Sequence, residues 1–225
     1  MTNDLNNYGG VSLSADGGKL LTVVQDRPAR LYVAPFAEPE RVTLLPLGIA
    51  NYRETAWLPD GRLIYSLGVN GQYDVTGQRD LWVTEVEGSQ PPRQPQRLTS
   101  DQRGNWMPVV SADGRWVVYV SRRSGNYNLW RCDADGSHDM QLTFNGGSHP
   151  RLTPDGQWVF FQNQEACWKV PLQGGTPVKV VPYSSGHPDV SPDGKWLVYT
   201  YLDRVLNQFR VAVREMESGV VRYTS

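Results

Sequence analysis

The sequence predicts an all-β fold made of repeated four-stranded antiparallel sheets, and two observations support this prediction. A tetrapeptide ending in Asp-Gly occurs five times, with its aspartate at residues 16, 60, 113, 155 and 193. A run of β-branched and aromatic residues follows three of the copies, as in Trp116 to Tyr119. Strand-rich repeats of roughly 40 to 50 residues are typical of the blades of a β-propeller.

Each tetrapeptide predicts a tight turn between the first two strands of a repeat. In the third copy, Asp113 is able to bond its own backbone and Gly114 accepts a positive φ. Proline presets φ at the second position of three other copies. The five predicted turns are residues 14–17, 58–61, 111–114, 153–156 and 191–194.

Two further strands recur in each period. A third strand is expected at residues 31–33, 81–83, 129–131 and 167–169, and a fourth at 97–99, 141–143 and 222–224. Their β-branched and aromatic content excludes solenoids of paired helices with a similar period. We therefore expect a single β-propeller domain over residues 1–225, with blades at 7–45, 51–99, 106–143, 149–181 and 187–224.

Two aligned sets of tryptophans are expected in the core, because large rings fill the layers between blades. One set stands on the second strands and the other on the third strands. They are Trp116, Trp158 and Trp196, and Trp82, Trp130 and Trp168.

The run from Ser111 to Thr143 resembles the TolB-type (WD40-like) propeller repeat, and the resemblance covers essentially the whole chain in five copies. The first copy departs from the pattern with Lys19 where the third has Trp116. Similar arrays occur in periplasmic TolB, in the gating propellers of prolyl oligopeptidase-type peptidases and in sensor regions of bacterial receptor-type serine/threonine kinases. The opening residues most resemble the last group. The resemblance is compatible with a periplasmic or extracytoplasmic location, but the compartment stays open.

Two architectures are compatible with this array. When Asp16 is aligned with Asp113, the chain begins and ends at the same phase of the repeat. This favours an array taken from a propeller of six to eight blades. A closed five-bladed ring is the alternative.

Composition excludes several partners. The net charge of −1, from 22 basic and 23 acidic residues, gives no field that concentrates nucleic acid. No run of 18 apolar residues is present, so we expect no membrane insertion by this segment, and the polar residues after Met1 do not form a signal peptide.

The chemistry-bearing motifs of common enzymes are missing. The sequence has no GxSxG, HExxH, GxxxxGK[ST] or GxGxxG motif, so no catalytic residue, cofactor or metal is assigned. Cys132 and Cys167 lack the spacing of a zinc or redox motif. A disulfide between neighbouring blades and two free, buried thiols both fit the sequence, and the free thiols are expected.

One aligned set of residues is a candidate ligand site. Six residues ahead of each motif aspartate stand Gly10, Glu54, Met107, His149 and His187. Equivalent positions on the innermost strands of a propeller ring one end of its channel, where His149, His187 and Glu54 are suited to a metal or an anion. The alternative is that each His-Pro pair is only a polar lead into a strand.

Arg151 and Asp189 stand two residues after the histidines and are expected to pair across adjacent blades. Only Glu54 and Asp189 are placed as carboxylates for a glycosidase, which needs two converging acids. The sequence therefore predicts a non-catalytic module that binds a protein, peptide or small ligand at its channel mouth and loops, as a sensory or scaffolding part of a larger protein. The alternative is the gating propeller of a prolyl oligopeptidase-like peptidase.

Overall fold

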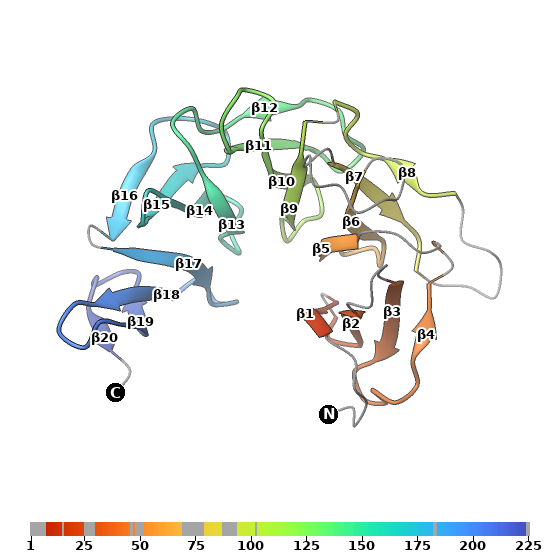
Figure 1. The fold of residues 1–225 in the computed structure, drawn as a ribbon, viewed down its shortest axis with the longest axis horizontal. Coiled ribbons are helices and arrows are strands. Elements are labelled where there is room, and N and C mark those ends of the chain that lie inside the picture. Colours follow the sequence, from red (N-terminus) through yellow and green to blue (C-terminus); the bar gives the residue numbers. More distant parts are fainter. Residues whose placement is uncertain are drawn as a thin grey trace. The chain divides into compact units, whose positions relative to one another are not determined.

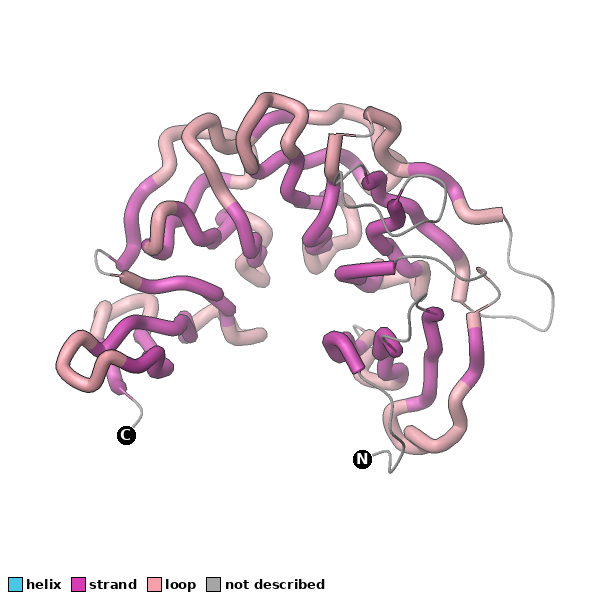
Figure 2. Tube along the Cα trace, in the orientation of Figure 1, coloured by secondary structure: helices cyan, strands magenta, loops and turns pink. Residues whose placement is uncertain are grey.

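The computed structural model describes residues 8–14, 16–24, 30–45, 47, 52–68, 79–86, 94–101, 103–181 and 184–223. Within those ranges the chain consists of strands, turns and loops, and Figure 2 shows no helix there. The described strands form five four-stranded antiparallel sheets, and in each sheet the strands follow one another in chain order (Figure 1). The predicted all-β fold with propeller-type blades is confirmed.

The first two sheets have these strands. Sheet one holds β1 (Tyr8–Leu13), β2 (Lys19–Val24), β3 (Arg30–Pro35) and β4 (Thr43–Leu44). Sheet two holds β5 (Tyr52–Trp57), β6 (Leu63–Gly68), β7 (Arg79–Thr84) and β8 (Gln96–Arg97).

The remaining three sheets follow the same plan. Sheet three holds β9 (Asn105–Val110), β10 (Trp116–Ser121), β11 (Asn128–Asp133) and β12 (Met140–Gln141). Sheet four holds β13 (Ser148–Leu152), β14 (Trp158–Asn163), β15 (Ala166–Pro171) and β16 (Val178–Val181). Sheet five holds β17 (Ser185–Val190), β18 (Trp196–Asp203), β19 (Gln208–Glu215) and β20 (Val221–Tyr223).

The chain divides into two compact units. Unit 1 holds residues 1–110 and 134–136, and unit 2 holds residues 111–133 and 137–225. The division falls inside the third repeat, between residues 110 and 111. The expectation of a single domain stays a prediction, as does the choice between a closed ring and part of a larger propeller.

The Asp-Gly turns fold as their chemistry predicts. In the third repeat the N–H of Gly114 donates to the carbonyl of Ser111 at 2.8 Å, and Gly114 has φ 72°. Ser111 Oγ donates to Asp113 Oδ1 at 2.5 Å and accepts from the N–H of Trp116 at 2.8 Å. The serine hydroxyl holds the pKa of Asp113 below its ordinary value. The turn thus satisfies its own polar groups.

The same hydroxyl-to-carboxylate bond recurs in three other turns, between Ser14 and Asp16, Thr153 and Asp155, and Ser191 and Asp193. The second repeat has Leu58 in place of the hydroxyl residue. There the carboxylate of Asp60 accepts from Arg62 instead, from both the backbone N–H and the guanidinium of that arginine. The turn therefore needs the Asp-Gly pair more than the hydroxyl.

Each unit has its own apolar core between neighbouring sheets. In unit 1, Leu21 and Leu31 of sheet one pack with Trp57, Leu63 and Tyr65 of sheet two. The core of unit 2 joins Phe160, Cys167 and Val181 of sheet four to Leu197, Tyr199 and Ala212 of sheet five. Face-to-face packing of consecutive sheets is how propeller blades bury their apolar area.

The tryptophans agree with the prediction only in part. Trp116 is buried and the other five are partly buried. Trp82 and Trp158 pack against the apolar cores of the two units, so the expectation of core residues is confirmed for Trp116 and in part for these two. A cation lies over each of the six rings, for example Arg131 at 3.9 Å from Trp116 and Lys169 at 4.1 Å from Trp158. The large fully buried rings belong instead to Tyr65, Tyr119, Tyr199, Phe160 and Phe161.

The fourth strands in sheets two and three end earlier than predicted. β8 ends at Arg97 and β12 ends at Gln141, so the Leu-Thr pair that follows each is not part of the strand. Thr99 Oγ1 and Thr143 Oγ1 instead accept the N–H groups of Leu81 and Leu129, each at 2.9 Å. At these two positions a side-chain hydroxyl, and not a backbone carbonyl of the fourth strand, accepts the N–H of the third strand.

Candidate functional site

Four of the five aligned candidate positions mark a shared irregularity of the first strands. The pairing of first and second strands shifts between Gly9 and Val11, between Arg53 and Thr55, between Ser148 and Arg151, and between Gly186 and Asp189. Gly10, Glu54, His149 and His187 therefore lie within β-bulges. A bulge turns a side chain away from the ordinary alternation of a strand.

Three of these positions have a left-handed backbone. The φ angles of Met107, His149 and His187 are 53°, 52° and 49°. Residues with a Cβ adopt this region at a cost of roughly 1 to 2 kcal/mol, whereas glycine adopts it freely. The first repeat has Gly10 at the equivalent position.

The structure brings the two histidines together within unit 2. The rings of His149 on β13 and His187 on β17 lie with their centroids 4.4 Å apart and their planes at 64°. His149 is half-buried and His187 is exposed. The prediction that both histidines stand on neighbouring first strands and approach each other agrees with this geometry.

Neighbouring hydroxyls orient both rings. Ser148 Oγ donates to the carbonyl of Gln162, and Thr200 Oγ1 donates to the carbonyl of Gly186 at 3.0 Å. Each hydroxyl oxygen also lies within hydrogen-bond distance of the ring beside it, Ser148 Oγ at 3.2 Å from His149 Nδ1 and Thr200 Oγ1 at 3.4 Å from His187 Nδ1. In the neutral tautomer with the proton on Nδ1, each Nε2 presents a lone pair.

Partial burial lowers the pKa of His149 below its ordinary value, and the nearby His187 and Arg151 lower it further. Arg151 and Asp189 form the expected ion pair, with 3.4 Å between Nε and Oδ1. Both side chains of this pair are exposed, so it contributes little to stability. The pair places one positive and one negative side chain close to the two histidines.

Glu54 and Met107 belong to unit 1, so the site described here rests on unit 2 alone. In the described part of the chain no three His, Cys, Asp or Glu side chains form a group suited to hold a metal ion. The described ranges contain no helix that could cross a membrane. Cys132 and Cys167 are free and buried, as expected.

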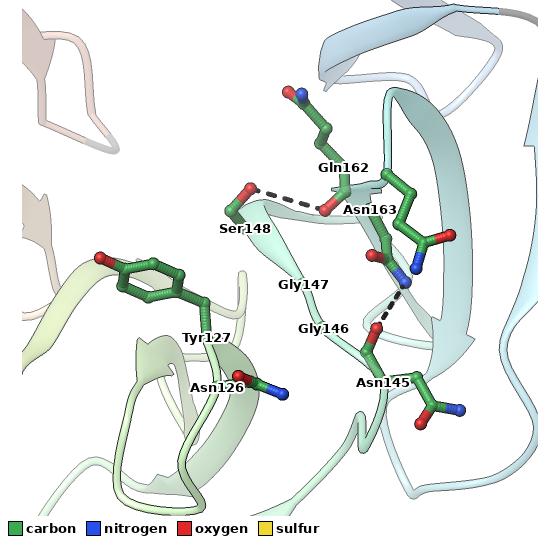
Figure 3. A pocket seen from close by; sticks show the side chains of 9 residues that line it. Asn126, Tyr127, Asn145, Gly146, Gly147, Ser148, Gln162 and Asn163 are labelled. Atoms are coloured by element: carbon green, nitrogen blue, oxygen red, sulfur yellow. Dashed lines mark hydrogen bonds between the residues drawn. The ribbon is translucent and has the colours of Figure 1, made fainter.

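A pocket next to the histidine pair was missed in the sequence. Its cavity of about 340 Å³ is lined by the loop between β10 and β11, by the chain that leads into β13 with the first residue of that strand, and by the end of β14 with the turn after it (Figure 3). Ser148 and Gln162 belong both to this pocket and to the surroundings of the histidines. The lining residues are Asn126, Tyr127, Asn145, Gly146, Gly147, Ser148, Gln162, Asn163 and Gln164. The only available signal was a high local density of Asn, Gln and Gly in three separate loops.

Comparison with known proteins gives one relative in sequence and several in structure. No known protein-family profile matches the chain. The uncharacterized protein Atu1656 of Agrobacterium fabrum is 30% identical over 112 residues, which cover 49% of this chain and 35% of that protein. The chain thus spans about a third of the length of this relative.

The solved structures are similar in fold. TolB from Acinetobacter baumannii matches with a TM-score of 0.75 at 16% identity, over 96% of this chain and 53% of that one. A TolB-like protein from Agrobacterium tumefaciens matches with a TM-score of 0.75 at 20% identity, over 98% and 81%. A puromycin-hydrolyzing peptidase of Mycobacterium tuberculosis matches with 0.77 at 16%, over 98% and 37%. The chain has the fold of the TolB-type β-propeller proteins.

Proposed function

We propose that this chain is a non-catalytic β-propeller module that binds a protein, peptide or small ligand at the surface around His149 and His187. The observation that carries the proposal is the left-handed backbone that both histidines adopt at equivalent bulges. Residues held in sparsely populated backbone conformations cluster at binding and active sites.

The chemistry of the pair defines what it binds. The two Nε2 lone pairs suit a zinc-like cation or a hydrogen-bond donor when the rings are neutral. After protonation the same rings suit a carboxylate. Two protein ligands are fewer than the three or four of ordinary zinc sites, so the affinity for Zn²⁺ is modest.

Calorimetric titration tests this proposal. Zn²⁺ and acetate are titrated at pH 7.5 and pH 5.5 into the wild type and into a His149→Asn/His187→Asn variant, since asparagine tolerates a left-handed backbone. We expect Zn²⁺ to bind the wild type more strongly at the higher pH and acetate more strongly at the lower pH. Identical titrations of the two proteins contradict the proposal.

The second candidate is the gating propeller of a prolyl oligopeptidase-like peptidase. The structural match to the puromycin-hydrolyzing peptidase supports it, and the equally good match to TolB supports the binding module. The open reading frame that contains this chain distinguishes the two. A GxSxG α/β domain supports the peptidase, and a kinase or other receptor domain supports a sensor.

A further inference from the structure

We propose that the pocket beside the histidine pair binds a neutral saccharide. This inference rests on the proposed binding role and gives it a ligand class, but it does not depend on the histidines as ligands. The cavity, at about 340 Å³, lies at the small end of the range for small-molecule sites. That volume suits a mono- or disaccharide.

The lining carries no charge. Amide side chains come from Asn126, Asn145, Gln162, Asn163 and Gln164, and the remaining residues are tyrosine, glycine and serine. An amide donates through nitrogen and accepts through oxygen. Sugar hydroxyls also donate and accept, so a set of amides matches a set of hydroxyls without needing an ion. A charged ligand meets no opposite charge among the residues that line this pocket.

Two of the five amide side chains are held by hydrogen bonds within the protein, and three are available to a ligand. Asn163 Nδ2 donates to the carbonyl of Asn145 at 3.1 Å (Figure 3). Gln162 Oε1 accepts from the backbone N–H of His187 at 3.3 Å. The exposed amides of Asn126, Asn145 and Gln164 make no hydrogen bond to any described residue. The fixed amides shape the pocket, and the available amides supply its specificity.

Tyr127 provides an aromatic surface at the pocket. Its ring is about half exposed, at 48%, and the guanidinium of Arg122 lies 5.1 Å from the ring centroid. The C–H groups of a sugar pack on such a ring, while its hydroxyls reach the surrounding amides. An aromatic ring beside several amides therefore fits a pyranose better than a free ion.

Two backbone features hold the pocket open. Gly146 has φ 103°, and a Cβ there lies only 2.8 Å from Asn163 Oδ1. Gln164 and Glu165, the two central residues of the β14–β15 hairpin, have φ 45° and 57°. Asn-Gly adopts such a turn with less strain. The hairpin thus keeps a glutamine at the pocket against its backbone preference.

A polar peptide is the competing ligand, and the lining favours the saccharide. Peptides are usually held by an open strand edge or by apolar pockets for alternate side chains. The only large apolar group of the lining is the Tyr127 ring.

The test uses ¹⁵N-labelled full chain with cellobiose, maltose and chitobiose as probes. Digalacturonate is the charged comparison and the peptide Gly-Asn-Gly is the polar peptide comparison. Side-chain amide resonances and saturation-transfer difference signals report binding. We expect the neutral sugars to shift the amides of Asn126, Asn145 and Gln164 with a dissociation constant of about 1 mM.

Pocket variants locate the binding. Tyr127→Ala should weaken it roughly tenfold, and Asn145→Ala roughly threefold to tenfold. Gln157→Ala removes an exposed amide outside the pocket and should leave it unchanged. Melting curves confirm that each variant is folded. Binding that Tyr127→Ala leaves intact overturns the inference, as does a stronger response to the peptide or to digalacturonate.

The histidine variant separates this inference from the proposed function. His149→Asn/His187→Asn should still bind the sugars, since the pocket amides remain. If Zn²⁺ binds the wild type but no neutral sugar does at tens of millimolar, the saccharide inference fails and the histidine site stands. If sugars bind while Zn²⁺ and acetate do not, the histidine site fails and the pocket stands.

Discussion

At the scale of single residues, His149 combines backbone strain with an unfavourable place for a charge. Its φ is 52°, its ring is half-buried, and His187 and Arg151 lie close to it. Burial and the two neighbouring groups all favour the neutral ring, so its pKa in the folded protein lies below its ordinary value.

This shift predicts that acid weakens the fold through His149. As pH falls through about 6.5, the unfolded chain takes up a proton that the folded protein does not, so the free energy of unfolding decreases. The decrease is complete once pH passes below the folded-state pKa. Urea denaturation at pH 7.5 and pH 5.5 should show a smaller loss of stability in His149→Asn than in the wild type. Equal losses in both proteins refute the prediction.

The positions of the site residues were predictable, but the orientation of their side chains was not. The constant distance from the Asp-Gly turn identified His149 and His187 as equivalent residues. The hydroxyls of Ser148 and Thr200, which orient the rings, have no signal in a single sequence. They act through the strand register, which pairs Ser148 with Gln162 and Gly186 with Thr200.

At the scale of elements, the Ser-Ala-Asp-Gly turn of the third repeat is held by hydrogen bonds among its own residues and Trp116. Ser111 is buried, donates to Asp113 and accepts from Trp116. Ser111→Ala leaves the buried N–H of Trp116 without this partner, so we expect a loss of about 1 to 2 kcal/mol in stability. Chemical denaturation measures it, with Ala112→Ser in the same turn as the control. An unchanged midpoint for Ser111→Ala contradicts this account.

The hairpin between β14 and β15 should respond in the opposite direction. Gln164 and Glu165 both have a positive φ, so replacement by Asn-Gly should raise stability by about 1 kcal/mol. Thermal unfolding measures the gain. The same replacement puts the shorter side chain of asparagine in place of Gln164, so its amide reaches less far into the pocket. Sugar binding should therefore weaken while stability rises. A loss of stability indicates that the glutamine and glutamate side chains hold the turn.

Strand number, turn position and blade order were predictable because each repeat carries the same local signals. The burial of the tryptophans was not. A tryptophan in a predicted strand suggests a packed ring. The cation that covers the ring, such as Lys169 over Trp158, stands on the neighbouring strand, and the repeat period does not show which residues of two strands lie side by side. The Leu-Thr ends of the fourth strands were misread for a related reason, since side-chain bonds from threonine replace ladder bonds only in the folded sheet.

At the scale of the whole molecule, a buried polar network in unit 1 provides a site where a single substitution should destabilise that unit. Asp80 is buried and accepts from Thr99 Oγ1 at 2.9 Å, from Asn105 Nδ2 at 3.2 Å and from the guanidinium of Arg97. Asp80→Asn removes the charge that Arg97 binds and should cost about 2 kcal/mol.

The reactivity of the two cysteine thiols measures the unfolding of unit 2. Cys132 and Cys167 lie in unit 2 and are buried, and burial raises the pKa of Cys167 to about 11. Neither should react with a thiol reagent in the folded protein, because the thiolate is the reactive form.

The single-domain prediction is tested by combining these two features. Repeats of this kind are stabilised by their neighbours, and the division between the units falls inside the third repeat, so we expect the chain to unfold as one cooperative domain. Asp80→Asn, in unit 1, should then lower the urea concentration at which both cysteines of unit 2 become reactive. The shift should equal the one seen by tryptophan fluorescence, with Asp139→Asn as a matched change within unit 2. If Asp80→Asn alters fluorescence at low urea while thiol reactivity keeps the wild-type midpoint, the two units unfold independently and the single-domain prediction is wrong.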